Sequence, residues 1–235
     1  MKYKKQVLSF GCGVNSVAIL VLAQQKKINL DLVVFADTGS EMPETYNYLK
    51  NVVLPYCKEN NIEFVTVGSP TMYEEYYSRK IIPYRMFRSC TDKYKIRPIR
   101  AYLKERYGND NYDIIIGIDA GESHRAKTGA LYPLIELNID RDGCKKIISD
   151  AGLSVPIKSG CYFCPFQKSS DWKALYYNYP DLFKKSEDFE KNCKAYPEFF
   201  LGQVKLENLR TAITEQRTLF PTKERSVQQC CFCHS

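Results

Sequence analysis

The stretch Ser9–Ser16 constrains the fold more than any other part of this chain. It reads Ser-Phe-Gly-Cys-Gly-Val-Asn-Ser and interrupts a short β-rich run that begins at Val7. Apolar residues then return with helical spacing at Val17, Leu20 and Val21. This pattern predicts a strand, a glycine-containing loop and a helix in direct succession.

A loop of this kind suits an anion such as phosphate. Gly11 and Gly13 can take backbone angles that are closed to other residues, and they let the main chain approach a ligand. The first amides of the following helix then point unpaired donors at the anion. Ser9 and Ser16 would add hydroxyl groups at the rim of the loop. The alternative is a tight strand-to-helix turn without a ligand, because a short glycine motif is weak evidence.

Further strands are expected at 30–36, 64–67 and 112–118, with helical segments between them. Such alternation predicts an α/β fold with a parallel sheet, whose ligands bind at the carboxyl ends of the strands. The strand at 112–118 is nearly all apolar, which favours a central strand buried on both faces. We expect a nucleotide-binding domain over residues 1–157 and a helical extension with cysteines over 158–235.

Composition limits the classes of protein that fit. The chain has 235 residues, 44% of them hydrophobic, which is enough to bury a full core. Its longest apolar run is far shorter than the ~20 residues that span a bilayer, so we expect a cytoplasmic protein with no membrane partner. A net charge of +7 suits an anionic partner such as a nucleotide or a nucleic acid.

The segment 68–88 is rich in tyrosine and basic residues. Interleaved aromatic and basic side chains can stack on and clamp a nucleic-acid strand. They can equally form the packed lid of a small active site. The sequence leaves both interpretations open.

Ten cysteines in a chain of this class indicate metal or redox sites more than disulfides. Cys161 and Cys164 form a Cys-x-x-Cys pair, and the chain ends Cys230-Cys231-Phe232-Cys233-His234. Two thiolates two residues apart can bind one metal ion or cluster, and a distant thiol-rich element can complete its coordination. Buried thiols without a metal are the alternative.

Five segments in order resemble the phosphoadenylyl-sulfate (PAPS) reductase family of the adenine-nucleotide α-hydrolase, or PP-loop ATP pyrophosphatase, superfamily. They lie at 9–16, 37–46, 90–99, 119–125 and 132–136. The usual loop reads Ser-Gly-Gly-x-Asp-Ser; here Phe10 replaces the first glycine, one residue is inserted, and Asn15 stands where the aspartate is usual. The resemblance implies about five mainly parallel strands flanked by helices and carrying one adenine nucleotide.

The resemblance also implies roles for individual residues. Lys95 and Arg125 would hold the phosphate or sulfate groups during catalysis. An ordinary surface salt bridge is the alternative for Glu122 and Arg125, which are three residues apart. The residues expected to bind the nucleotide, either ATP or an adenylyl sulfate (PAPS or APS), are Ser9, Gly11, Gly13, Asn15, Ser16, Asp37, Thr38, Gly39 and Glu122.

For the cysteines, the resemblance implies a [4Fe-4S] cluster, with zinc as the alternative. Its ligands would be Cys90, Cys161 and Cys164. Because Thr91 stands where the family has a second adjacent cysteine, the fourth ligand would come from the terminal group that includes Cys230, Cys231 and Cys233. The family's nucleophilic cysteine lies in a C-terminal Glu-Cys-Gly-Leu-His tail, of which this chain shares only a Cys followed by a His, and the resemblance on this point implies Cys233 as the catalytic thiol.

Three functions follow from the resemblance. The first is a sulfonucleotide reductase-like enzyme, in which a thiol attacks the sulfur of an adenylyl sulfate and a thioredoxin-type reductant completes the reaction. The second is an ATP pyrophosphatase that activates a nucleic acid, tRNA or DNA, for sulfur insertion. The third is a nucleotide-binding protein without catalysis.

Overall fold

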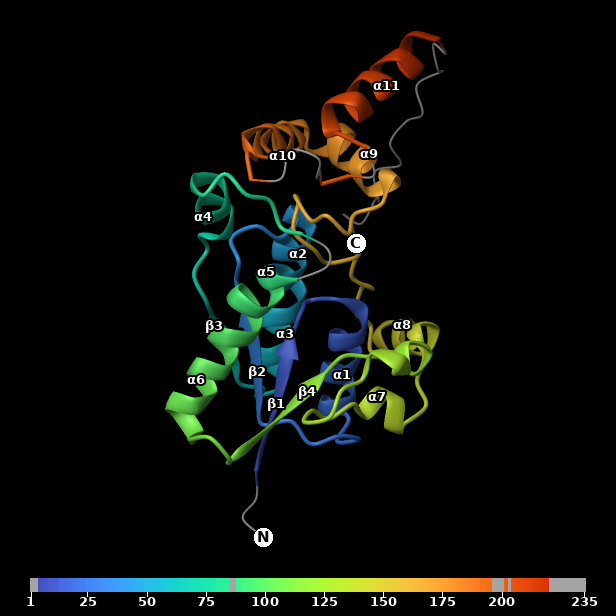
Figure 1. Cartoon of the computed structure of the whole chain (residues 1–235). Coiled ribbons are helices and arrows are strands. Elements are labelled where there is room, and N and C mark those ends of the chain that lie inside the picture. The colour runs from blue at the N-terminus through green and yellow to red at the C-terminus, as the bar shows by residue number, and fades with distance from the viewer. Residues whose placement is uncertain (1–3, 85–87, 196–200, 203, 220–235) are drawn as a thin grey trace.

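A parallel sheet forms the centre of the protein in the computed structural model, which describes residues 4–84, 88–195, 201–202 and 204–219. Its strands are β1 (Lys5–Phe10), β2 (Leu32–Ala36), β3 (Phe64–Val67) and β4 (Tyr112–Ile116). They pair in the order β3-β2-β1-β4, and each pairing is parallel (Figure 1). The predicted α/β class with a parallel sheet is confirmed.

Helices connect and cover these strands. The first half of the chain contains α1 (Val14–Gln24), α2 (Pro43–Tyr48), α3 (Leu54–Glu59), α4 (Met72–Ser78), α5 (Ser89–Thr91) and α6 (Arg97–Tyr107). The second half adds α7 (Pro133–Glu136), α8 (Arg141–Asp150), α9 (Ser169–Asn178), α10 (Pro180–Asn192) and α11 (Leu206–Leu219). Two π-helical turns, η1 (Leu49–Val53) and η2 (Asp92–Ile96), and a 3-10 turn, η3 (Ala120–Arg125), join some of them. None of the helices in the described residues is long and apolar enough to cross a membrane.

The sheet differs from the expected one in its number of strands and in the place of β4. The described residues contain four strands, and the expected fifth is reduced to one parallel bridge between Ile115 and Leu131. Two hydrogen bonds make this bridge, from Leu131 N to Ile114 O (2.8 Å) and from Ile116 N to Leu131 O (3.0 Å). β4 therefore lies at the edge of the four-stranded sheet, and the expectation of a central strand was wrong.

Both faces of the sheet are covered, which explains its nearly continuous apolar strands. Side chains alternate along a strand, so Leu8 and Val33 face one layer while Val7 and Leu32 face the other. The first layer holds α1, η1, α3, α7 and α8. The second layer is α6, whose Ile99 and Leu103 are buried in a cluster with strand residues.

A second hydrophobic core lies beyond the carboxyl ends of the strands, where α9 and α10 stand in Figure 1. Trp172, Phe183 and Phe189 from these helices are almost fully buried. Met72 and Tyr76 of α4 belong to the same core, so it draws on chain segments on both sides of residue 157. The division into domains at 157 remains a prediction; the structure shows that the second core is built from both parts.

Chain order creates a switch point in the sheet. After β1 the chain builds β2 and then β3 on one side of it, and later returns to place β4 on the other side. In sheets of this kind, the loops that leave two such strands at their carboxyl ends diverge, and ligands bind in the crevice between them. The segment Gly11–Gly13 and the segment Gly117–Asp119 are those two loops.

Gly39 provides a test of this architecture. Its φ is +68°, and a Cβ there would overlap the backbone carbonyl of Pro70. We expect Gly39→Ala to lower the free energy of unfolding by about 2 kcal/mol or more, because backbone strain and a steric clash add. Gly152→Ala is the matched control, since Gly152 has a φ of +73° and open space around it. Urea denaturation compares the two; equal losses would contradict the packing of Gly39 on Pro70.

Candidate functional site

The loop after β1 has the predicted position but not the predicted backbone conformation. Gly13 caps α1 with a φ of −100°, and neither Gly11 nor Gly13 has a positive φ. Cys12 takes the left-handed conformation instead, with a φ of 56°. The expectation that the glycines are needed for their backbone angles was therefore wrong. Open space lies beside Gly11, where a Cβ would have no heavy atom within 4 Å, whereas a Cβ on Gly13 would lie 3.1 Å from Ser159 Oγ.

Ser16 closes the loop onto the first turn of α1. Its hydroxyl donates to Gly13 O at 2.9 Å and accepts from Gly13 N at 3.1 Å. This local pairing fixes the start of the helix and aligns its first amides towards the crevice. Ser9 lies within β1, in register with Val34 and Ile116. The part of Ser9 and Ser16 in binding a nucleotide stays a prediction.

Asn15 crosses the switch point to the end of β4. Its Nδ2 donates to Asp119 Oδ2 at 2.9 Å and to Gly117 O at 3.2 Å, while its Oδ1 accepts from Arg141 Nη1 at 3.4 Å. Asn15 and Asp119 are both almost fully buried. An aspartate at position 15 could make neither of the two donations, so the amide is matched to Asp119.

The segment after β2 lies beside this crevice. Asp37 Oδ1 accepts from Gly39 N at 2.8 Å and from the Tyr46 hydroxyl at 2.7 Å, which holds the turn in shape. Thr38 is fully buried, and its Oγ1 lies 3.9 Å from Cys161 Sγ. The structure thus brings Thr38, a predicted nucleotide-binding residue, next to Cys161, a predicted metal ligand.

Glu41 joins these residues into a charged cluster that the sequence did not indicate. Its Oε1 lies 2.6 Å from Lys95 Nζ and 3.9 Å from Cys161 Sγ. The Glu41 side chain has no exposed surface, and its Oε2 has no hydrogen-bond partner among the described residues. Burial by itself would lower the pKa of Lys95, but Glu41 and neighbouring Cys161 outweigh it and raise that pKa. The Lys95 side chain therefore stays protonated, as a cation in the same cluster as the Cys161 thiol.

The cysteine turn packs directly on this cluster. Cys164 N donates to Cys161 O at 3.1 Å, which closes the turn, and burial together with the Glu41 carboxylate raises the pKa of Cys161 well above its usual value. Burial also raises the pKa of Cys164, with a smaller contribution from Cys90. In the described part of the chain, no three His, Cys, Asp or Glu side chains are grouped so as to hold a metal ion. Of the expected ligands, Cys230, Cys231 and Cys233 lie outside the described residues.

Glu122 and Arg125 lie on η3, which follows β4. Arg125 Nη1 is 2.6 Å from Glu122 Oε2, and both side chains are more than 40% exposed. This is the geometry of the surface salt bridge that the sequence offered as the alternative. Their part in holding a nucleotide stays a prediction.

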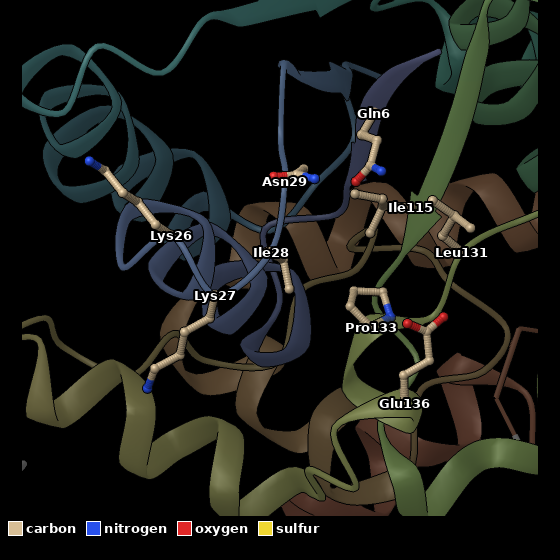
Figure 2. A pocket seen from close by; sticks show the side chains of 9 residues that line it. All are labelled: Gln6, Lys26, Lys27, Ile28, Asn29, Ile115, Leu131, Pro133 and Glu136. Carbon is tan, nitrogen blue, oxygen red and sulfur yellow. The ribbon is translucent and has the colours of Figure 1, made fainter. Parts of the chain in front are cut away.

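A hollow of about 330 Å³ lies away from these residues (Figure 2). Gln6 near the start of β1 and the segment Lys26–Asn29 before β2 form part of its wall, together with Pro133 and Glu136. It therefore lies towards the amino ends of the strands, and none of the predicted site residues lines it. We place the candidate site at the carboxyl ends, where the Asn15–Asp119 pair and the cluster of Glu41, Lys95 and Cys161 lie in segments that follow the strands.

Sequence comparison gives relatives from an archaeon and a phage. The chain is 24% identical to the uncharacterized protein MJ0973 of Methanocaldococcus jannaschii, over 92% of this chain and 55% of that protein. It is 30% identical to the uncharacterized nin region protein ORF290 of Escherichia phage lambda, over 52% of this chain and 50% of that protein. The chain thus spans about half the length of these curated relatives.

Two solved structures are similar to part of this chain. One is phosphoadenylyl-sulfate (PAPS) reductase from Candida auris in a phosphate complex, with a TM-score of 0.45 and 16% identity over 66% of this chain and 75% of that one. The other is U34-tRNA thiolase NcsA from Methanococcus maripaludis with its [4Fe-4S] cluster, with a TM-score of 0.48 and 14% identity over 81% of this chain and 73% of that one.

The family match rests on the segment that contains the sheet. The phosphoadenosine phosphosulfate reductase domain matches residues 5–132, from the start of β1 to the end of the loop that follows η3. That segment is more than half of the 235 residues, and it includes Asn15, Asp119, Lys95 and Glu41. This protein belongs to the phosphoadenosine phosphosulfate reductase domain family.

Proposed function

We propose that this protein binds an adenylyl sulfate at the crevice between β1 and β4 and reduces its sulfate group to sulfite. The observation that supports the proposal is that the predicted anion-binding loop, the half-buried Lys95 and the Cys161 thiol lie at the same edge of the sheet. Ser159, two residues before Cys161, lies beside the loop, since a Cβ on Gly13 would come within 3.1 Å of Ser159 Oγ. The cysteine turn thus lies next to the loop.

The chemistry follows from the charges at this edge. The amides at the start of α1 would hold the phosphate, and Lys95 would stabilise negative charge on the sulfate as its bond to the phosphate breaks. A cysteine thiolate attacks the sulfur, and the adenosine phosphate leaves with the bridging oxygen. An enzyme S-sulfonate remains, which a thiol reductant of the thioredoxin type converts to sulfite. The resemblance assigns the attacking thiol to Cys233.

A metal centre is not completed by the described residues. Cys161 and Cys164 supply two sulfur donors in one turn, but the neighbouring Glu41 carboxylate is already paired with the Lys95 ammonium. A [4Fe-4S] cluster or a zinc ion needs further ligands, which the resemblance assigns to Cys90 and to the terminal group that includes Cys230, Cys231 and Cys233. The described residues alone hold no complete ligand set, and no step of the proposed reaction is routed through a metal centre.

A second candidate function is an ATP pyrophosphatase that activates a nucleic acid for sulfur insertion. The net charge of +7 favours it, because a basic surface attracts an anionic acceptor. The tyrosines of the 68–88 segment give this second function little support, because two of them pack against other side chains. Tyr73 packs on Phe163 and Phe189, at ring distances of 5.7 and 5.1 Å, and Tyr76 is buried in the second core. These two rings are engaged in packing, which supports the reductase as the first candidate.

Gly11→Val tests the loop as the phosphate site. A Cβ on Gly11 projects into open space, so the fold should be unaffected while the added methyl groups occupy the ligand's place. We expect affinity for adenylyl sulfate, measured by calorimetry, to fall at least about tenfold with an unchanged unfolding midpoint. Lys146→Gln, an exposed residue of α8, is the control and should bind as the unchanged protein does. Undiminished affinity in Gly11→Val would show that the loop is only a turn.

Product analysis distinguishes the two enzymatic functions. With adenylyl sulfate and a thiol reductant, a reductase should give sulfite and the matching adenosine phosphate. With ATP and a nucleic-acid acceptor, an ATP pyrophosphatase should give AMP and pyrophosphate instead. Lys95→Met should lower the rate of the correct reaction by about 100-fold, because a group that stabilises transition-state charge is lost. If the protein forms pyrophosphate but no sulfite, its function is that of the second candidate, the ATP pyrophosphatase.

The Asn15–Asp119 pair predicts a pH effect on stability. Asn15→Asp would place two carboxylates within about 3 Å of each other, so the pKa of the pair should rise in the folded protein; Arg141, which faces Asn15, offsets part of this. We expect a loss of about 2 kcal/mol at pH 7 and a smaller loss at pH 5. A raised folded pKa stabilises at low pH, and that contribution disappears as pH rises through it.

The control for this pair is the exchange of both residues. Asn15→Asp combined with Asp119→Asn restores one amide and one carboxylate, so most of the stability should return. Chemical denaturation at pH 5 and pH 7 measures both variants. A loss in Asn15→Asp that does not depend on pH, or that the double variant fails to rescue, would contradict a direct carboxylate–amide contact.

A further inference from the structure

Cys161 and Cys164 are placed differently from Cys12, Cys57 and Cys144, which are buried in the first core and are poorly accessible there. Cys161 and Cys164 are partly exposed and lie on a loop at the candidate site. They are free thiols in this structure.

The turn that carries Cys161 and Cys164 has a geometry in which the two thiols can form a disulfide. Cys164 N donates to Cys161 O at 3.1 Å, the hydrogen bond of a four-residue turn. Such a turn keeps its end Cα atoms less than about 7 Å apart, which overlaps the range that a disulfide requires. A disulfide across this turn would close a very short loop, so it could form and open without rearrangement of the fold.

Backbone contacts fix this turn against the end of β2. Glu41 and Cys161 form an isolated antiparallel bridge, in which Met42 N donates to Gly160 O at 2.8 Å and Tyr162 N donates to Ser40 O at 3.0 Å. Gln167 Nε2 donates to Cys161 O at 3.0 Å from the other side. The Cys161 thiol is therefore held beside Thr38 and Lys95.

Two charged groups lie at the Cys161 thiol. Its Sγ donates towards Glu41 Oε1 at 3.9 Å, and that carboxylate can accept the proton during attack. The Lys95 ammonium is paired with the same carboxylate, so a positive charge belongs to the same cluster. Lys95 also remains partly exposed, so it can contact a bound sulfate.

We propose that Cys161 and Cys164 form a redox-active dithiol that attacks the substrate sulfur and supplies both electrons for its reduction. This proposal rests on the proposed reductase function and deepens it, because it places the nucleophile within the crevice rather than at Cys233.

The reaction balances in two steps. Cys161 gives its proton to Glu41, its sulfur bonds to the sulfur of the adenylyl sulfate, and the bond from that sulfur to the bridging oxygen breaks with release of the adenosine phosphate. Cys164 then loses its proton to solvent and attacks Cys161 Sγ, and sulfite leaves with the bonding electron pair. Sulfur falls from +6 to +4 while two thiols become one disulfide. An external dithiol of the thioredoxin class restores the thiols.

A single-turnover experiment tests the proposal. The full chain is reduced, freed of reductant and mixed with adenylyl sulfate. We expect about one sulfite per chain and a loss of two hydrogens from the peptide Ser159–Lys168, which trypsin releases between Lys158 and Lys168. Cys164→Ser should stop at an SO3 adduct on the same peptide, with sulfite released only after an external thiol is added. Cys193→Ser, outside the site, should behave as the unchanged protein does.

Other outcomes would overturn the proposal while the reductase function stands. These are undiminished single-turnover sulfite in Cys161→Ser, an SO3 adduct on the peptide that contains Cys233, or stoichiometric iron or zinc that both Cys161 and Cys164 retain throughout turnover. If the unchanged protein gives no sulfite, the proposed function fails. A titration of the full chain with reduced and oxidised dithiothreitol then tests the dithiol independently: a two-electron transition in Ser159–Lys168 supports it, and its absence overturns it.

Discussion

Parallel pairing of β1 with neighbours on both sides is the constraint on which the rest of the structure depends. β1 hydrogen-bonds to β2 over Val7–Phe10 and to β4 over Lys5–Ser9, so three strands end at one edge. The segments that follow them carry Asn15, Thr38 and Asp119. Because the next strands in the chain are placed on one side of β1 and β4 on the other, these segments lie where ligands of such sheets bind.

A buried ion pair accompanies this arrangement. Glu41 and Lys95 lie 54 residues apart, and the glutamate side chain is wholly enclosed. Burying a carboxylate is costly unless it is paired, so Lys95 and Glu41 depend on each other for their position. The same pair orients the Cys161 turn through the bridge at Glu41. The second core then holds this turn from behind, with Tyr162 and Phe163 both buried within it. Stability and the placement of the reactive groups are therefore linked.

Much of the fold follows from local patterns. Apolar runs bounded by polar segments located all four strands, and the step from β-rich to helical spacing at residue 17 located α1, because each pattern reflects burial within one element. The edge position of β4 could not be found this way. An apolar strand can be covered by a neighbouring strand or by a single bridge such as Leu131, and both coverings leave the same sequence.

The site divides in the same manner. The sequence by itself determined the strand, loop and helix at residues 5–24, the family and the polar residues at strand ends, since these depend on residues that are near one another in the chain. Only the tertiary structure decided that Asn15 meets Asp119, that Glu41 pairs with Lys95, and that Cys161 lies beside Thr38. These contacts join residues 54 to 123 positions apart. No local pattern specifies them, because they arise from the order in which the strands pair.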